Sequence, residues 1–327
     1  MINNYEIRKL EFEKLKYALG APLYCPADNE SVVDKIINKE YEKIPLIIFC
    51  LEDSILEENL EQATISLKNK LEKLLEYQKN NIYANLPLLF IRIRTYKHLE
   101  ETLKWVHPKY KSIISGFVLP KYDSRVSSKY KEIINNVNSA KHNYYFLPIL
   151  ETEVFTNTLL RKKELERTKE EINNTKGILG ILIGTNDMCN IYGIRRNVNQ
   201  TIYDIGVIRD TLSDIISTFS NDYVVNGAVW EYFDGDEWKG GLVKEFELDK
   251  LNGFIGKSCI HPKQVEVVLE NIKIDKKDYL EAMGILNWNI KNGVSKGNTT
   301  GRMNEIATHK VWANKIKILS EIYGIKE

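Results

Sequence analysis

The sequence has few cysteines, and none lie at the close spacing that a metal site or a disulfide framework uses. The four thiols are far apart along the chain, and no CxxC pair occurs (Cys25, Cys50, Cys189 and Cys259). This spacing gives no indication of a zinc site or of paired disulfides. Each cysteine lies in or beside an apolar run, where a free thiol behaves as a small hydrophobic side chain. Such usage is typical of a reducing compartment, so we expect a cytoplasmic protein.

Long apolar runs and an excess of one charge are also missing. No run approaches the roughly 20 apolar residues that a membrane-spanning helix needs. The first twenty residues are highly charged, which predicts that they are not a secretory signal. Lys and Arg number 46 against 45 Asp and Glu, a formal net charge of +1. This balance gives no reason to expect a nucleic acid or an anionic membrane as a partner.

The chain does contain a series of short apolar runs separated by polar segments of helical composition. Its 327 residues, 43% of them hydrophobic, are enough for one large barrel or two ordinary domains. Eight runs are predicted to be strands: 21–27, 45–51, 86–95, 115–121, 144–152, 178–187, 224–232 and 254–262. Their starts are about 33 residues apart, close to the ~31 residues per unit of a (β/α)8 barrel. We therefore expect an α/β fold of the (β/α)8 TIM-barrel type. The main rival is a doubly wound open sheet, but no GxGxxG motif follows the first strand.

Helical segments are expected on both sides of this series. Residues 1–19 are charged with spaced apolar side chains, which predicts an N-terminal amphipathic helix. Ser54, with Glu57 three places on, forms a capping-box pattern that predicts the start of another helix. We expect residues 1–270 to form the barrel domain and residues 271–327 to form a helical extension with a final helix from Asn304. The extension would pack on the barrel or on a neighbouring subunit.

Two predicted strands end in carboxylates, Glu151 and Asp187. A strand, a helix and a second strand form a parallel unit, so both strand ends lie at the same edge of the sheet. Neighbouring strands are roughly 4.8 Å apart, which lets the two carboxylates reach one hard cation. Mg²⁺ is typically held by one or two carboxylates, with water and substrate completing its shell. Either acid alone would more often cap the following helix, but the pair favours a metal site.

Other charged residues are predicted at neighbouring strand ends. Arg92 and Arg94 lie two residues apart on the third strand, hence on one face. They either bind a substrate carboxylate, which suits the guanidinium group, or point outward, or pair with Glu52 and Asp53 after the second strand. Lys121, after the fourth strand, is a candidate for an anion contact, for a Schiff-base lysine of the kind some barrel enzymes use, or for a solvated side chain.

Taken in order, these segments resemble the HpcH/HpaI aldolase and citrate lyase β-subunit superfamily over about residues 20–270. The motifs that carry the resemblance are Leu23-Tyr24-Cys25-Pro26-Ala27, Leu51-Glu52-Asp53, Ile91-Arg92-Ile93, Leu119-Pro120-Lys121, Ile149-Leu150-Glu151-Thr152, Ile183-Gly184-Thr185-Asn186-Asp187, and Gly253-Phe254-Ile255-Gly256-Lys257 with Ile260-His261-Pro262. The chain looks most like the branch known as C–C bond lyases of the TIM-barrel fold. That branch is associated with bacterial tellurite-resistance and stress-response gene clusters.

The resemblance implies a Mg²⁺-dependent lyase, with Mn²⁺ as an alternative ion. It implies a 2-oxo acid or a CoA thioester as substrate, and a homo-oligomer that is a trimer or larger. By position, Glu151 and Asp187 match the metal ligands, and Arg92 matches the substrate-binding arginine. Glu52 and Asp53 match the acidic pair that orders metal-bound water. The predicted catalytic residues are Arg92, Glu52 and Asp53, and the predicted substrate contacts are Arg92, Arg94 and Lys121.

The chain departs from these relatives at two positions. Relatives commonly have Arg-Ile-Asn on the third strand, where this chain ends in Arg94, and an Asp on the seventh strand, where it has Trp230. The next residue, Glu231, would face the opposite side of a strand, so it does not replace that Asp. This departure argues against cleavage of citryl-CoA or malyl-CoA. Lys257 and His261 lie in a motif that we expect to be mainly structural.

These expectations lead to one hypothesis and two alternatives. The hypothesis is an enzyme that makes or breaks a carbon–carbon bond next to a carbonyl, with Mg²⁺ stabilising an enolate. A metal-bound water or a carboxylate of Glu52 or Asp53 would transfer the proton. The first alternative is a catalytically altered barrel that binds a ligand or serves as an assembly component of a tellurite-resistance-type stress system. The second is hydrolysis or phosphoryl transfer at the same metal.

Overall fold

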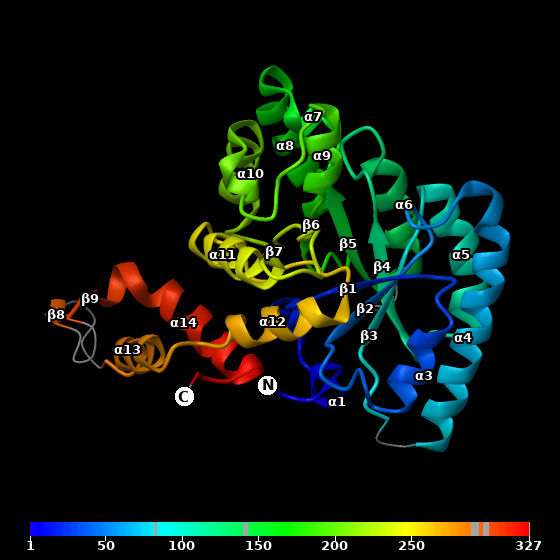
Figure 1. Ribbon diagram of the computed structural model, residues 1–327, viewed down its shortest axis with the longest axis horizontal. Coiled ribbons are helices and arrows are strands. Elements are labelled where there is room, and N and C mark those ends of the chain that lie inside the picture. The colour runs from blue at the N-terminus through cyan, green and yellow to red at the C-terminus, as the bar shows by residue number, and fades with distance from the viewer. Residues whose placement is uncertain (82–83, 140–142, 289–293, 297–300, 327) are drawn as a thin grey trace.

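The computed structural model describes residues 1–81, 84–139, 143–288, 294–296 and 301–326. Within them, one sheet of seven parallel strands runs in chain order, each strand pairing with the next (Figure 1). The strands are β1 (Leu23–Pro26), β2 (Leu46–Cys50), β3 (Leu88–Arg92), β4 (Ile114–Leu119), β5 (Tyr145–Leu150), β6 (Ile181–Ile183) and β7 (Val225–Asn226). Each overlaps a run predicted to be a strand, and the expected parallel α/β barrel is confirmed.

Helices fill the connections and cover the outside of the sheet (Figure 1). After β1 to β4 come α3 (Ser31–Ile37), α4 (Leu60–Asn80), α5 (Tyr96–Lys109) and α6 (Ser127–Val137). After β5 to β7 come α7 (Glu153–Thr156), α8 (Thr158–Asn173), α9 (Thr185–Ile191), η3 (Ile202–Asp204), α10 (Gly206–Phe219) and α11 (Trp238–Leu251), and α12 (Pro262–Ile272) follows. The helix start predicted at Ser54 is wrong. A 3-10 turn, η2 (Glu57–Asn59), precedes α4, and the Glu57 side chain pairs with Arg94 instead of capping a helix.

Residues 254–260 close the sheet into a ring, although they form no regular strand. On one side, the Gly227 N–H donates to the Gly256 carbonyl at 2.8 Å. On the other side, the Tyr24 N–H donates to the Cys259 carbonyl at 2.9 Å. The eighth predicted strand is therefore present as isolated parallel bridges to β1 and to the residues after β7. We call residues 254–260 the closing segment.

All seven strands are shorter than predicted, β6 and β7 most of all, and for β7 the cause is visible. Arg196 Nη2 donates to the Val229 carbonyl at 2.6 Å, and Gln264 Nε2 donates to the Trp230 carbonyl at 2.8 Å. These side chains take the place of a neighbouring strand, so the backbone leaves the sheet. β6 ends at residue 183, and Asp187 therefore lies in the first turn of α9 rather than on the strand.

The N-terminal segment is broken, which corrects the prediction of a single helix over residues 1–19. It consists of α1 (Asn4–Ile7), α2 (Phe12–Leu15) and a 3-10 turn, η1 (Lys16–Leu19). The break begins at Arg8, whose guanidinium donates to the carbonyls of Pro87 at 2.8 Å and Ile113 at 3.0 Å, just before β3 and β4. These long-range bonds override the local helical periodicity and fix the segment across the amino-terminal end of the barrel.

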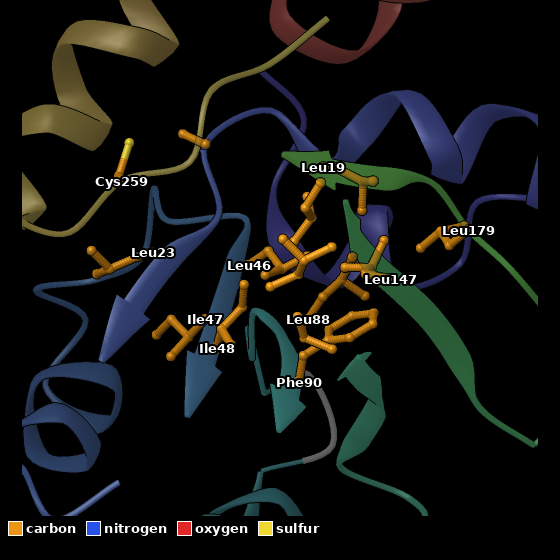
Figure 2. Close-up of a cluster of buried hydrophobic side chains, with 14 of the residues drawn as sticks. Leu19, Leu23, Leu46, Ile47, Ile48, Leu88, Phe90, Leu147, Leu179 and Cys259 are labelled. Atoms are coloured by element: carbon orange, nitrogen blue, oxygen red, sulfur yellow. The ribbon is translucent and has the colours of Figure 1, made fainter. Parts of the chain in front are cut away.

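The amino-terminal end of the barrel is filled by apolar side chains. Figure 2 shows Leu19 of η1 among side chains of the sheet, with Leu46, Leu88 and Leu147 around it. All four are 3% exposed or less. Gly180, before β6, leaves room for Leu19 because a Cβ there would lie 2.9 Å from its Cδ1. The interior of the barrel is therefore a packed core at this end of the strands.

The residues after α12 project away from the barrel (Figure 1). α13 (Lys276–Leu286) packs against α14 (Ile306–Tyr323), and β8 (Val294–Lys296) pairs with β9 (Met303–Glu305) between them. The final helix predicted from Asn304 is confirmed. Its last turn returns to the barrel, where Tyr323 Oη donates to the Tyr17 carbonyl at 2.8 Å. The division into domains at residue 270 stays a prediction. In the described ranges, no helix is long and apolar enough to cross a membrane.

Candidate functional site

A cavity of about 320 Å³ lies at the carboxyl ends of the barrel strands. Active sites of (β/α)8 barrels are built at this end. Four residues predicted from the sequence to form the site line the cavity, namely Asp53, Arg92, Glu151 and Asp187. Two more predicted residues, Glu52 and Lys121, lie within ion-pair distance of these four. The structure therefore gathers the predicted charged groups at one place, with the exception of Arg94.

Arg92, the last residue of β3, is held on one side by the acidic pair. Its Nη2 lies 2.7 Å from Glu52 Oε2 and 2.9 Å from Asp53 Oδ2, and the predicted pairing is thus present. The side chain is nearly buried, and its Nε has no hydrogen-bond partner among the described residues. A buried donor without a partner is unfavourable. Arg92 therefore lines the cavity with one N–H that no described residue satisfies.

Lys121 follows β4 in the left-handed region, with φ of +50°, which is unusual for a residue other than glycine. Its backbone N–H donates to Glu151 Oε1 at 2.8 Å, and its Nζ lies 2.6 Å from Glu52 Oε1 and 3.6 Å from Asp187 Oδ1. Burial acts to lower the pKa of Lys121, but the hydrogen bond to Glu52 and the nearby carboxylates raise it above its ordinary value. The amine is therefore protonated at neutral pH, which argues against a Schiff base.

Glu151, directly after β5, is the most deeply buried acid of the site at 3% exposed. Burial raises the pKa of Glu151 to about 7, with Arg92 acting against the shift and Asp187 adding to it. Gly184 lies against this carboxylate, and a Cβ at that position would overlap Glu151 Oε2. Glycine is therefore required after β6 to leave space for the Glu151 side chain.

Glu151 and Asp187 suit a magnesium ion that is completed by other oxygen ligands. Among the residues with described positions, no group of three His, Cys, Asp or Glu side chains is placed to hold a metal. Mg²⁺ commonly takes only one or two carboxylates from the protein and keeps water or substrate oxygens in its remaining positions. The two carboxylates lining one cavity fit that donor set.

Arg94 does not line this cavity, which corrects the prediction that it shares a face with Arg92. β3 ends at Arg92, so the strand alternation does not continue to Arg94. The Arg94 Nε donates to the Leu51 carbonyl at 2.8 Å, and its two terminal nitrogens contact the Ile55 carbonyl and the Glu57 carboxylate. The side chain therefore braces the loop after β2, and it lines a separate hollow together with Glu52 and Asp53. Its predicted contact with a substrate stays a prediction.

Trp230 and Glu231 both lie outside the cavity lining. The Trp230 ring is fully buried, with the Arg196 Cζ 5.1 Å from its centroid. Glu231 Oε1 lies 3.0 Å from Arg195 Nε. The cavity-lining residue of this stretch is Val229. No acid from this stretch is therefore among the described residues that line the cavity.

Lys257 and His261 make structural contacts, as expected. Lys257 is fully buried, and its Nζ lies 2.8 Å from Glu245 Oε1 and 2.7 Å from Asp249 Oδ2 on α11. His261 is the N-cap of α12, where its Nδ1 accepts a hydrogen bond from the Lys263 N–H at 3.2 Å. Both residues hold the closing segment to the helices outside it.

Several cavity residues had no predicted role. They are uncharged, and those with polar side chains are Tyr24, Cys50, Ser54, Asn186 and Ser258. Tyr24 belongs to one of the motifs that carry the family resemblance, but an isolated hydroxyl has no characteristic spacing in a sequence. The position of Tyr24 near the end of the first predicted strand is the sequence feature that could have predicted its place in the cavity.

The fold and the site define a class of protein, a parallel α/β barrel with buried carboxylates and an arginine at the carboxyl ends of its strands. The family model of C–C bond lyases of the TIM-barrel fold matches residues 13–325. The chain therefore belongs to this family and is a carbon–carbon lyase whose substrate the match does not specify. Among curated proteins, none matches the sequence.

Solved structures of citrate lyase-like proteins have the same fold. CitE from Mycobacterium tuberculosis, in complex with magnesium, acetoacetate and coenzyme A, is 18% identical with a TM-score of 0.61, covering 92% of this chain and 98% of CitE. A citrate lyase from Burkholderia xenovorans LB400 is 13% identical with a TM-score of 0.67, covering 94% and 93%. RipC from Yersinia pestis is 18% identical with a TM-score of 0.54, covering 79% and 96%. The family match confirms the predicted resemblance to the C–C bond lyases of the TIM-barrel fold, and these structures share its fold.

Proposed function

We propose that the chain is a Mg²⁺-dependent carbon–carbon lyase or aldolase that acts on a 2-oxo acid or an acyl-CoA substrate in the cavity. The observation that carries this proposal is the charge of the site. Its four carboxylates surround only two cationic side chains (Glu52, Asp53, Glu151 and Asp187 against Arg92 and Lys121). With all four carboxylates ionised, the partly buried site carries an excess of two negative charges, and a divalent cation would compensate that excess and oppose the rise in the pKa of Glu151.

A relative supports the choice of ion and substrate. The CitE structure from Mycobacterium tuberculosis contains magnesium, acetoacetate and coenzyme A. By analogy, Mg²⁺ is the expected ion here, with Mn²⁺ as an alternative because carboxylate oxygens suit both. A CoA thioester is the corresponding candidate for a co-substrate.

The residues of the site would bind the metal ion and the substrate through different side chains. Glu151 and Asp187 would hold the ion, and the Lys121 N–H fixes the Glu151 carboxylate by its hydrogen bond to Oε1. A divalent ion bound there supplies Lewis-acid stabilisation of the negative charge that develops on the substrate oxygen. Arg92 offers its free Nε–H to the substrate carboxylate. Lys121 adds a second positive charge beside Asp187 and remains a candidate for an anion contact.

Glu52 and Asp53 are the candidates for proton transfer. Burial raises the pKa of Glu52, and its hydrogen bond with Asp53 adds to the shift. A carboxyl group whose pKa lies nearer to neutrality exchanges protons more readily at physiological pH. Glu52 is also fixed in place, because it is 2.7 Å from Arg92 Nη2 and 2.6 Å from Lys121 Nζ.

The second candidate function is a barrel without turnover that binds a ligand or assembles with other components of a tellurite-resistance-type stress system. The stretch after β7 favours this alternative, because relatives commonly carry an Asp on the seventh strand and no acid of this stretch lines the cavity here. The intact Glu151 and Asp187 favour the lyase. For either function we expect a homo-oligomer, a trimer or larger, in the cytoplasm.

Calorimetric titration with Mg²⁺ and pyruvate tests the lyase proposal. Wild-type protein should bind pyruvate only with Mg²⁺ present, and Glu151→Gln combined with Asp187→Asn should weaken Mg²⁺ binding at least about tenfold. Asp210→Asn, which changes an exposed carboxylate on α10, is the matched control and should bind like the wild type. If the folded double variant binds Mg²⁺ as the wild type does, the metal site is wrongly assigned and the non-catalytic alternative is favoured.

A further inference from the structure

The cavity has two unlike walls. The wall formed by the ends of β2 to β5 and the start of α9 carries the carboxylates and cations described above. The opposite wall is formed by β1, the residues after β7 and the closing segment. Its lining residues are Tyr24, Pro26, Val229, Ser258 and Ile260. We call this side the neutral wall, because none of these lining residues carries a charge.

Tyr24 presents a free hydroxyl on the neutral wall. Its side chain makes no hydrogen bond with any residue that the structure describes, although its ring centroid lies 5.8 Å from the Arg92 Cζ. Burial raises the pKa of Tyr24 above its ordinary value, with the charge of Arg92 acting against the shift. The phenol therefore stays neutral and can donate a hydrogen bond at physiological pH.

Ser258 lies beside Tyr24 in the ring of strands. The closing segment pairs with β1 through the bond between the Tyr24 N–H and the Cys259 carbonyl, which brings the neighbouring Ser258 to the same wall. Ser258 is 3% exposed, and its Oγ has no hydrogen-bond partner among the described residues. Buried hydroxyls are normally paired, so this group and the Tyr24 hydroxyl together form an unsatisfied donor pair facing the cavity.

Arg92 lies near this wall, 5.8 Å from the Tyr24 ring centroid, but it is paired with Glu52 and Asp53 and would bind the 2-oxo acid end of the substrate. Among the described residues that line the neutral wall, none supplies a second counter-charge for a further carboxylate.

Arg196, which lies behind the neutral wall, points its Nε at Glu245 Oε2, 3.3 Å away, and donates from Nη2 to the Val229 carbonyl. Arg196 is only 2% exposed, so it cannot turn towards the cavity without leaving these partners. Arg195 is paired with Glu231. A carboxylate enclosed without a cation is far less favourable than a neutral oxygen that accepts hydrogen bonds.

We propose that Tyr24 and Ser258 form a subsite that donates hydrogen bonds to an uncharged oxygen of the substrate and selects against a second carboxylate. This inference rests on the proposed function, since it takes the 2-oxo acid end of the substrate to be bound at Arg92, Glu151 and Asp187. The substrate class is then a 2-oxo acid whose other end carries a hydroxyl or carbonyl oxygen.

Three 2-oxo acids of four carbons test the subsite, because they differ only at the far end. These are 2-oxobutanoate with a methyl group, 4-hydroxy-2-oxobutanoate with a hydroxyl, and freshly dissolved oxaloacetate with a carboxylate. Calorimetry with saturating Mg²⁺ should give the tightest binding for the hydroxyl compound, about 3- to 10-fold tighter than the methyl compound, as one or two hydrogen bonds allow. Oxaloacetate should bind more weakly than both.

Two variants assign the effect to the named side chains. Tyr24→Phe and Ser258→Ala each remove one oxygen, and each should reduce the ratio of the affinity for the hydroxyl compound to the affinity for 2-oxobutanoate. Tyr223→Phe removes a hydroxyl before β7, at the opposite end of the barrel, and should leave all three affinities as they are. Circular dichroism and thermal unfolding would establish that each variant is folded.

The outcomes separate this inference from the proposed function. If 2-oxobutanoate shows no Mg²⁺-dependent binding to the wild type, the proposed function itself fails. If it binds with Mg²⁺ but oxaloacetate binds tightest, or if Tyr24→Phe and Ser258→Ala keep the hydroxyl preference, the subsite is wrong and the lyase proposal is unaffected. An equal loss of all three affinities in Tyr24→Phe would also overturn the subsite, since it would indicate a general effect on Arg92.

Discussion

At the scale of single residues, Gly184 leaves the space that the carboxylate of Glu151 occupies in the candidate metal site. Glu151 is nearly buried, and its Oε2 occupies the space that a Cβ at Gly184 would need. The carboxylate is held from its other oxygen by the Lys121 N–H at 2.8 Å. Any side chain at position 184 must therefore displace Glu151 from the position at which it would meet the ion.

We expect Gly184→Ala to weaken Mg²⁺ binding by at least about tenfold, because displaced metal ligands typically cost 10- to 100-fold in affinity. Calorimetric titration with Mg²⁺ measures the loss. Gly240→Ala on α11 is the matched control, because a Cβ there meets no atom within 4 Å, and it should keep wild-type affinity. Wild-type affinity in Gly184→Ala would mean that Glu151 is not a ligand.

The charged residues of the site could be predicted from the sequence, and the neutral ones could not. Glu52, Arg92 and Glu151 each directly follow or end an apolar run, and the carboxyl ends of parallel strands meet at one edge. Their charge makes them conspicuous at that position. Tyr24 and Ser258 also lie near predicted strand ends, but hydroxyl-bearing residues are common there. Their unpaired oxygens are a property of the packed barrel alone.

At the scale of elements, the loop between β2 and η2 is held in place by an arginine from the next strand. Arg94 contacts the Leu51 and Ile55 carbonyls, on either side of the acidic pair, and the Glu57 carboxylate in η2. Glu52 and Asp53 thus reach Arg92 from a loop that is fixed at both ends. Arg94, which stands where relatives commonly have Asn, thus positions Glu52 and Asp53 indirectly by holding their loop.

Arg94→Met should loosen the loop, because it leaves the Leu51 and Ile55 carbonyls without their donor. We expect faster amide hydrogen exchange over residues 51–59 and a loss of about 1–3 kcal/mol in the free energy of unfolding, as for other broken hydrogen bonds to a charged group. Arg209→Met, which removes an exposed guanidinium on α10, is the control. Unchanged exchange in the loop would show that Arg94 does not brace it.

The strands that match their predicted ranges best pair with a strand on both sides. β2 and β5 are buried throughout or nearly so, and each pairs with a strand on both sides. β7 is short because Arg196 and Gln264 bind the carbonyls that follow it. The N-terminal segment is broken because Arg8 reaches carbonyls before β3 and β4. In both cases side chains distant in sequence override a pattern that is visible only locally.

At the scale of the whole molecule, the segment that closes the barrel is tied to α11 by buried charges. Lys257 in the closing segment pairs with Glu245 and Asp249 of α11, and all three side chains are almost fully buried. Tyr203 Oη adds a hydrogen bond to Asp249 Oδ1 at 2.7 Å. The cluster adds to the backbone hydrogen bonds that the closing segment makes on one side with β1 and the residues before it, and on the other side with β7 and the residue after it.

Lys257→Met should destabilise the protein by about 3–5 kcal/mol, because it leaves two buried carboxylates without their shared cation. Chemical denaturation measures the change in the free energy of unfolding. Lys250→Met, which removes a partly exposed lysine from the same region of α11, should cost much less. Adding Asp249→Asn to Lys257→Met should restore part of the stability. A small effect of Lys257→Met would mean that the barrel closes without these ion pairs.

Cys50 places a thiol in the cavity whose chemical modification can be measured. All four cysteines are buried, but only Cys50 lines the cavity, with its Sγ 3.9 Å from the Arg92 Nη1. A molecule bound beside Arg92 would shield this thiol, whereas the other three thiols would be unaffected by it. The rate at which a small alkylating reagent modifies Cys50 therefore reports whether the cavity is occupied. Collections of metabolites can be screened by this protection, without knowing in advance which reaction the enzyme catalyses.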